Sequence, residues 1–238
     1  MRNLWRGCTG KREVLPSLRD AASELVPSMS ITAAIRGALV RNKLLISAVA
    51  ITFFAIIILT AVIAYAVLLT SPELMKGLED LVGSTRAYVA IPPPYTKGLY
   101  FLIFLNNIGH FWNPLRIWVW APFIGAFSLG YELLANAVVI GAVISFTNIT
   151  KGAMYTIAGL TPHGVFEIPA FILEFAGLAR WHITTTRSLY EKLSGRSVNR
   201  PLLKEGVSDT LLLSLLSVVL FAIAAYFESY VTPRFLGL

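Results

Sequence analysis

Three ionisable side chains share one face of an apolar segment in the C-terminal half of the chain. His163, Glu167 and Glu174 are separated by four and seven residues. At about 100° per residue in an α-helix, they fall within a sector of roughly 40°. Such a stripe has the groups needed to bind a metal ion, to transfer a proton, or to hydrogen-bond to a neighbouring helix. In a membrane, ionisable groups are costly and by default mark a buried interaction or a functional site.

The sequence leaves these roles open. Two ligands are too few for a catalytic zinc site, and neither His110 nor His182 is an obvious third. A general acid/base pair lacks a neighbouring Ser or Cys nucleophile. A transport or proton path would account for Glu174 and for the kink predicted at Pro169. Interhelical hydrogen bonds that lock a bundle, worth about 0.6 kcal/mol each, are the remaining interpretation. We assign no catalytic residue, metal ligand or cofactor at this stage.

The composition places the stripe in a membrane. Of the 238 residues, 56% are hydrophobic and 14% are charged, whereas about 25% are charged in a typical soluble protein. Residues 44–69 contain no charged side chain and exceed the ~20 residues that a helix needs to span a bilayer. The sequence therefore predicts an all-α, polytopic helical membrane protein.

Basic side chains gather in two segments, residues 1–43 and 187–205, and contribute to a net charge of +7. By the positive-inside rule, the N-terminus and a loop at 187–208 face the cytoplasm, and the C-terminus is external. The basic surplus reports orientation and contact with lipid headgroups, and it predicts no nucleic-acid partner. We expect a multi-pass protein of the plasma membrane.

The expected organisation is a cytoplasmic basic segment, 1–43, and a membrane domain, 44–238. Thr161 is a suitable N-cap and Pro162 a suitable first residue for the helix that bears the stripe. Polar residues, Gly and Pro between residues 99 and 149 predict short or broken helices there, which must be packed in protein. The five expected spans are about 44–70, 110–131, 133–149, 162–186 and 209–230, with external segments at 71–98 and 148–161.

This topology brings polar residues of several spans to one height beneath the external surface. The residues predicted to meet there are His163, Glu167, Glu228, Asn106 and Asn107. Glu174 lies about 16 Å from His163 along the helix axis. Near mid-bilayer it needs a partner or a proton. Asn136, at a break between two expected spans, completes the predicted polar set.

The order and spacing of several motifs resemble those of the stage II sporulation protein M family over residues 44–238. The motifs are residues 104–107 (Phe-Leu-Asn-Asn), 125–130, Asn136 with Gly141, 162–170 with Gly177, and 227–233. Their characteristic glycines and prolines are Pro162, Gly164, Pro169, Gly177 and Pro233. The chain departs from the family pattern at Asn113-Pro114, Arg116, Asn136-Ala137 and Glu174.

The resemblance implies a five-span scaffold. The family's named member recruits peptidoglycan-degrading partners during engulfment in spore-forming bacteria, and members also occur in organisms that do not sporulate, archaea included. We expect a non-sporulation relative that is not an enzyme and that organises envelope or membrane-remodelling partners. Its partners would be membrane lipids, other membrane or envelope proteins, or further copies of itself.

Two alternatives to a scaffold remain. The first is a permease-type transporter subunit that uses the His163/Glu167/Glu174 stripe as a polar path, and the second is an intramembrane hydrolase. A dry network with every polar atom paired would favour the scaffold. A water-filled or metal-filled cavity at the stripe would count against it.

Overall fold

A computed structural model describes residues 30–88 and 91–238. Most of the predicted cytoplasmic segment, residues 1–29, therefore lies outside the described residues. The described chain is helical and contains no β-strand, which confirms the all-α class. Within it, four helical stretches are long and apolar enough to cross a membrane. They are α3 (Lys43–Thr70), α6 (Ile124–Lys151), α7 (Ala153–Leu193), and the Arg200–Phe235 stretch that begins with α8 (Arg200–Tyr226).

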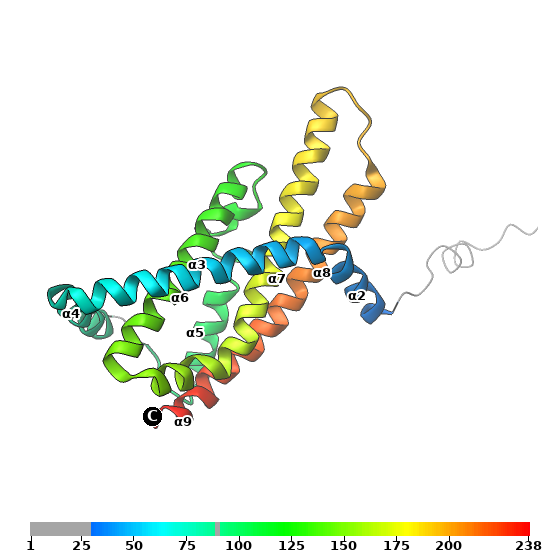
Figure 1. The fold of residues 1–238 in the computed structure, drawn as a ribbon. Helices are drawn as coiled ribbons and strands as arrows, with labels where there is room; N and C mark the ends of the chain where they lie inside the picture. Colours follow the sequence, from blue (N-terminus) through cyan, green and yellow to red (C-terminus); the bar gives the residue numbers. More distant parts are fainter. Residues whose placement is uncertain (1–29, 89–90) are drawn as a thin grey trace, which may run out of the picture.

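The helices pack around an antiparallel hairpin of α7 and α8 (Figure 1). Helix α3 crosses α6 and α7, with α2 (Ile31–Arg41) at one end and α4 (Pro72–Tyr88) at the other. Phe171, Phe175 and Phe221 form the centre of the apolar core, where the Phe171 and Phe221 rings meet edge to face at 5.4 Å. Phe171 and Phe175 of α7 therefore face protein rather than lipid.

The expectation of short or broken helices between residues 99 and 149 is confirmed. Helix α5 (Lys97–Asn107) has 11 residues, about 16 Å, which is half the ~30 Å hydrocarbon thickness. Two 3₁₀ turns follow, η1 (Gly109–Phe111) and η2 (Ile117–Trp120). The chain is not one helix over 110–131, and α6 is a single helix from 124 to 151 where a break was expected near 132. The Asn113-Pro114 pair separates the turns, whereas no proline interrupts α6.

The helix that bears the stripe begins nine residues earlier than predicted, at Ala153 rather than Pro162. Pro162 and Pro169 both lie inside α7, and the turn between α6 and α7 is made by Gly152 with φ +85°. Glycine adopts positive φ without a Cβ clash, so a single residue suffices for this turn. Residues 148–161 are therefore almost wholly helical rather than a loop. The expected 187–208 loop is likewise shortened to the residues between Leu193 and Arg200.

Helices α3 and α6 approach most closely at Gly141. A Cβ atom at this position would lie 2.6 Å from the Ile57 carbonyl oxygen and 3.0 Å from the Ala61 backbone nitrogen. Ser145, one turn further, donates a 2.6 Å hydrogen bond to the Ala61 carbonyl. The absence of a side chain at 141 thus sets the distance between the two helices.

We expect Gly141→Ala to lower the free energy of unfolding by about 2 kcal/mol, because the clash is with backbone that cannot rotate away. Denaturant titration of the purified protein in detergent measures the change. Gly130→Ala is the matched control in the same helix, since nothing lies within 4 Å of a Cβ placed there, and alanine should be neutral or stabilising. Equal stability of the two variants would contradict the close α3–α6 contact.

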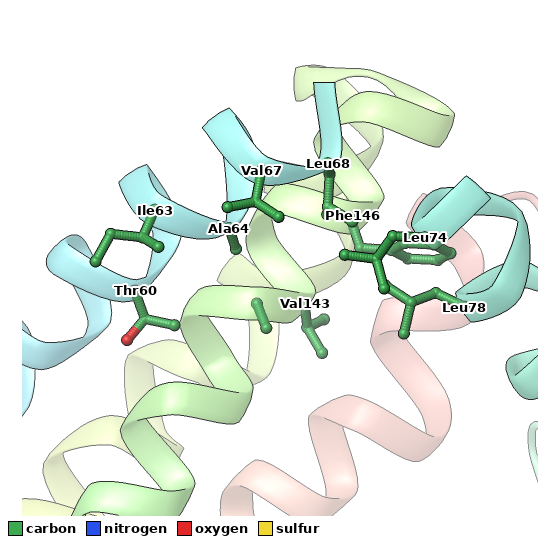
Figure 2. A pocket seen from close by; sticks show the side chains of 10 residues that line it. Thr60, Ile63, Ala64, Val67, Leu68, Leu74, Leu78, Val143 and Phe146 are labelled. Carbon is green, nitrogen blue, oxygen red and sulfur yellow. The ribbon is translucent and has the colours of Figure 1, made fainter. Parts of the chain in front are cut away.

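An apolar groove of about 560 Å³ opens between α3, α4 and α6. Figure 2 shows Ile63 and Val67 of α3, Leu74 and Leu78 of α4, and Val143 of α6 around it. Thr60 contributes the only hydroxyl among the described residues that line it, and none of those residues is ionisable. The groove therefore offers no groups for chemistry, and the candidate site lies elsewhere.

Candidate functional site

Residues from α5, α7 and the chain's C-terminal end meet in what we call the outer cluster: His163, Glu167, Glu228 and Asn107. His163 and Glu167 lie one turn apart on α7, with His163 Nε2 3.7 Å from Glu167 Oε2. Glu228 lies in η3 (Phe227–Val231), a π-helical turn after α8. One donor atom each from His163, Glu167 and Glu228 lie within 4.8 Å of one another. The cluster thus assembles from segments up to 121 residues apart in sequence.

Asparagines border the outer cluster. Asn107, at the end of α5, donates a 3.2 Å hydrogen bond from Nδ2 to Glu167 Oε1. Asn106 and Asn136 line the adjoining cavity of about 240 Å³, together with Asn107, His163 and Glu167. Asn136 also donates to the Glu132 carbonyl at 2.8 Å. Four of the five residues that were predicted to meet therefore line this cavity: Asn106, Asn107, His163 and Glu167. The fifth, Glu228, lies beside His163 and Glu167.

Glu174 is not part of the outer cluster. It is fully buried, and its Oε1 lies 2.8 Å from His110 Nδ1. The other ring nitrogen of His110 lies 2.5 Å from Glu132 Oε2, and Arg116 Nη2 donates to the same Glu132 oxygen at 2.9 Å. These four residues form a second set, which we call the inner network. It joins η1, the η1–η2 connection, α6 and α7.

Sequence reasoning predicted that Glu174 needs a partner but did not find it. The sequence suggests His110 only as a possible metal ligand, Arg116 only as a departure from the family pattern, and gives no role to Glu132. The charge balance of the apolar stretch from 99 to 149 could have indicated an ion pair, because this stretch contains one arginine, Arg116, and one glutamate, Glu132. Their pairing required knowledge of how the 3₁₀ turns fold back against α7.

Side chains of α7 hold the 3₁₀ turns in place. His182 Nε2 lies 2.8 Å from the Val119 carbonyl, and Trp181 Nε1 donates to the Trp120 carbonyl at 2.9 Å. Trp120 in turn donates from Nε1 to the His110 carbonyl at 2.9 Å. Irregular backbone at membrane depth is tolerated only where protein satisfies its polar groups. Here α7 supplies those partners.

A third polar set surrounds Asp209 of α8, which is fully buried. Arg41 binds both carboxylate oxygens, with Nε donating at 3.2 Å and Nη2 making the second contact. Asn42 donates from Nδ2 at 2.9 Å, and Arg180 Nε lies 3.9 Å away. The hydrogen bond to Asp209 raises the pKa of Arg41 above its usual value. This set, which sequence reasoning did not identify, ties the start of α3 to α7 and α8.

The motif glycines and prolines have different surroundings. Gly177 faces α8, where a Cβ would lie 3.3 Å from Leu213 Cβ, so it permits close α7–α8 packing. Gly164 has only the tip of Ile168 within 4.0 Å. Pro162 and Pro169 lie inside α7, and buried Pro233 lies in the short α9 (Thr232–Phe235). Of the two motif glycines in α7, Gly164 and Gly177, only Gly177 lies at a close approach to another helix.

These features define a class of protein: a helical integral membrane protein with four long apolar helical stretches in its described residues and buried polar sets arranged along its longest helix. The chain belongs to the stage II sporulation protein M family, whose model matches residues 48–233. It is also 33% identical over 127 residues to an uncharacterized protein of Methanocaldococcus jannaschii, covering 51% of this chain and 68% of that relative. No solved structure matches the chain significantly.

Proposed function

We propose that this protein is a non-enzymatic membrane scaffold that holds a projecting helical hairpin in a fixed orientation for partner proteins. The observation that carries the proposal is the length of α7. Its 41 residues extend about 61 Å, roughly twice the hydrocarbon thickness of a bilayer. Figure 1 shows the α7–α8 hairpin, in yellow and orange, continuing well past the level of α3.

The hairpin tip is built as a defined surface. Arg187 Nε donates to Glu191 Oε1 at 3.0 Å, and the second Glu191 oxygen accepts from the Asn199 backbone nitrogen at 3.0 Å. Asn199 caps α8 by accepting from the Leu202 nitrogen. A mobile tip would not need these connections, and a rigid tip loses less conformational entropy on binding a partner.

The positions of the basic residues determine which side of the membrane we propose for the hairpin tip. The basic residues near the tip are Arg187, Lys192, Arg196, Arg200 and Lys204. The Asp209 set links the start of α3 to the part of α8 near the tip. In the proposal, the positive-inside rule then assigns this side of the plasma membrane to the cytoplasm. Tyr95, before α5, is bound through its backbone to Ser229 at the opposite, external end. The chain would thus cross five times, with α5 and the 3₁₀ turns as the second crossing.

Photo-crosslinking from the hairpin tip tests the scaffold. We expect a photoreactive residue in place of Tyr190, which is 61% exposed, to form a discrete protein adduct in native membranes. Leu211 is the matched control, because it is 60% exposed but lies in the apolar part of α8, where lipid is the neighbour. Replacing Arg196 and Arg200 with glutamate should weaken the Tyr190 adduct. Equal adducts at both positions, or none at Tyr190, would contradict the proposal.

A permease-type subunit is the second candidate, favoured by the polar cavity beside His163 and Glu167. The two functions differ in what they require of these residues. A scaffold should keep its Tyr190 adduct in folded Glu167→Gln and His163→Gln variants. A permease should lose solute flux in the same variants while remaining folded.

A further inference from the structure

We propose that His163, Glu167 and Glu228 bind one divalent transition-metal ion, which fastens α7 to the C-terminal end of the chain. The three donor atoms already lie within 4.8 Å of one another. Metal–ligand bonds of about 2.0–2.2 Å place tetrahedral donors roughly 3.4 Å apart, so each pair must close by about 1.4 Å at most. Side-chain rotation covers that distance without movement of the helices.

The histidine is oriented as a metal ligand. His163 is only 9% exposed, and its Nδ1 lies 3.3 Å from Thr232 Oγ1. A metal-binding imidazole characteristically uses its second nitrogen in this way, which fixes the ring and leaves the first nitrogen for the ion. Nε2 makes no hydrogen bond to another described residue and lies on the Glu167 side. It therefore lies 3.7 Å from Glu167 Oε2 without a hydrogen bond among the described residues, in a position to accept an ion.

Glu167 is oriented in the same manner. Asn107 donates to its Oε1 at 3.2 Å, while its Oε2 is the oxygen nearest His163. A carboxylate that is held by one oxygen presents the other in a fixed direction, as the outer-shell partners of metal ligands generally do. Asn107 thus fixes the direction in which Glu167 presents its other oxygen to the ion.

Charge balance also favours a cation. Two carboxylates that lie together in a low-dielectric region repel each other, and both are favoured in the ionised form only beside positive charge. Glu228 has no ion pair or hydrogen bond with any side chain in the described ranges 30–88 and 91–238. Arg116 lines the adjoining cavity, but its guanidinium is bound to Glu132 and to the Asn106 carbonyl. A divalent ion would neutralise both carboxylates.

The backbone at Glu228 has π-helical geometry, which is common at functional sites. The helix widens into π-helical geometry over Phe227–Val231 before α9 begins. Single π-turns inside α-helices are rare and occur frequently at functional sites. The π-helical turn contains the proposed ligand Glu228, and the residue that follows the turn is Thr232, the partner of His163.

The donor set selects the class of ion. One imidazole with two carboxylates suits Zn²⁺ or Mn²⁺ better than Ca²⁺ or Mg²⁺, which prefer oxygen ligands alone. Three protein ligands leave at least one position for water, and the adjoining cavity of about 240 Å³ has room for it. A metal-filled cavity at the stripe counts against a scaffold where the ion reacts or is transported. We assign this ion a structural role, in which it joins α7 to the C-terminal end of the chain, so it is compatible with the scaffold and independent of the hairpin tip.

Metal analysis of the full chain tests the inference. Tag-free protein in detergent is stripped with a chelator, incubated with Zn²⁺ and desalted, and we expect about one zinc ion per chain. His163→Gln and Glu228→Gln should each reduce this to background. Asn107→Ala should retain the ligands but bind roughly 10-fold or more weakly. Glu191→Gln, in the same helix but near the hairpin tip, is the matched control and should bind as the unmodified chain does.

Co²⁺ substitution gives a readout that needs no variant. Four-coordinate Co²⁺ bound by the unmodified chain should show visible absorption, and Zn²⁺ should displace it. Absence of both zinc retention and the Co²⁺ spectrum in the unmodified chain would overturn the inference, as would full zinc retention by folded His163→Gln and Glu228→Gln variants. Neither outcome bears on the Tyr190 adduct, so the scaffold is tested separately.

Discussion

Replacing His110 with leucine is expected to lower the free energy of unfolding by about 3 kcal/mol or more. His110 is fully buried between Glu174 and Glu132, with Glu174 also fully buried. Without the imidazole, Glu174 retains no hydrogen-bond partner among the described residues, because its second oxygen is already unpaired. Removing one partner of a buried ionic pair costs more than the pair itself contributes, since the remaining group stays desolvated.

A double-mutant cycle separates this coupling from a loss of packing. Glu174→Leu alone should also destabilise the protein, whereas His110→Leu combined with Glu174→Leu should recover most of the loss, because no unpaired carboxylate remains. Unfolding by denaturant in detergent supplies the four free energies. Strictly additive losses would show that Glu174 and His110 do not depend on each other.

Asp209→Ala is expected to destabilise the protein by about 3 kcal/mol, the second large effect. The carboxylate is fully buried and is the common partner of Arg41 and Asn42, with Arg180 nearby. Arg41 can turn toward water when the carboxylate is lost, because its side chain is 40% exposed. Arg180 is 20% exposed and already has a buried Nε without a hydrogen bond, so it bears most of the cost.

Glu205→Gln is the control for Asp209, one turn earlier in α8. Glu205 also contacts Arg180, at 3.3 Å, but its side chain is 45% exposed. Exposed ion pairs contribute little, so this change should cost less than about 1 kcal/mol. The same denaturant titration measures both variants. If Glu205→Gln costs as much as Asp209→Ala, burial is not what makes the Asp209 set important.

The sequence predicts the membrane class because that class depends on the total hydrophobicity and charge of a segment. A run without charge over residues 44–69 is compatible with a bilayer span whatever lies around it. Helix α3 matches the expected 44–70 span within one residue at its start. The beginning of α7 was predicted wrongly, because the cap signal at Thr161-Pro162 is local. The helix continues through it, since Gly152 already provides the turn from α6.

The charges in the middle of the chain needed the tertiary structure. Arg116 precedes η2 and Glu132 follows it, 16 residues apart, and no helical or strand period places them together. His110 reaches Glu174 across 64 residues for the same reason. Periodicity describes one element at a time, whereas these contacts depend on how an irregular segment folds back.

By itself, the sequence determined that this is a helical membrane protein and which polar side chains of α7 share a face, because both follow from composition and the pitch of a helix. Only the tertiary structure decided how that face is divided. His163 and Glu167 meet Glu228 at the C-terminal end of the chain, and Glu174 meets His110. The offset of 11 positions from His163 to Glu174 separates them by about 16 Å along the helix, too far to share a partner. Which segment comes opposite each of them is set by the packing of η3 and the 3₁₀ turns against α7, and no pattern along the chain encodes it.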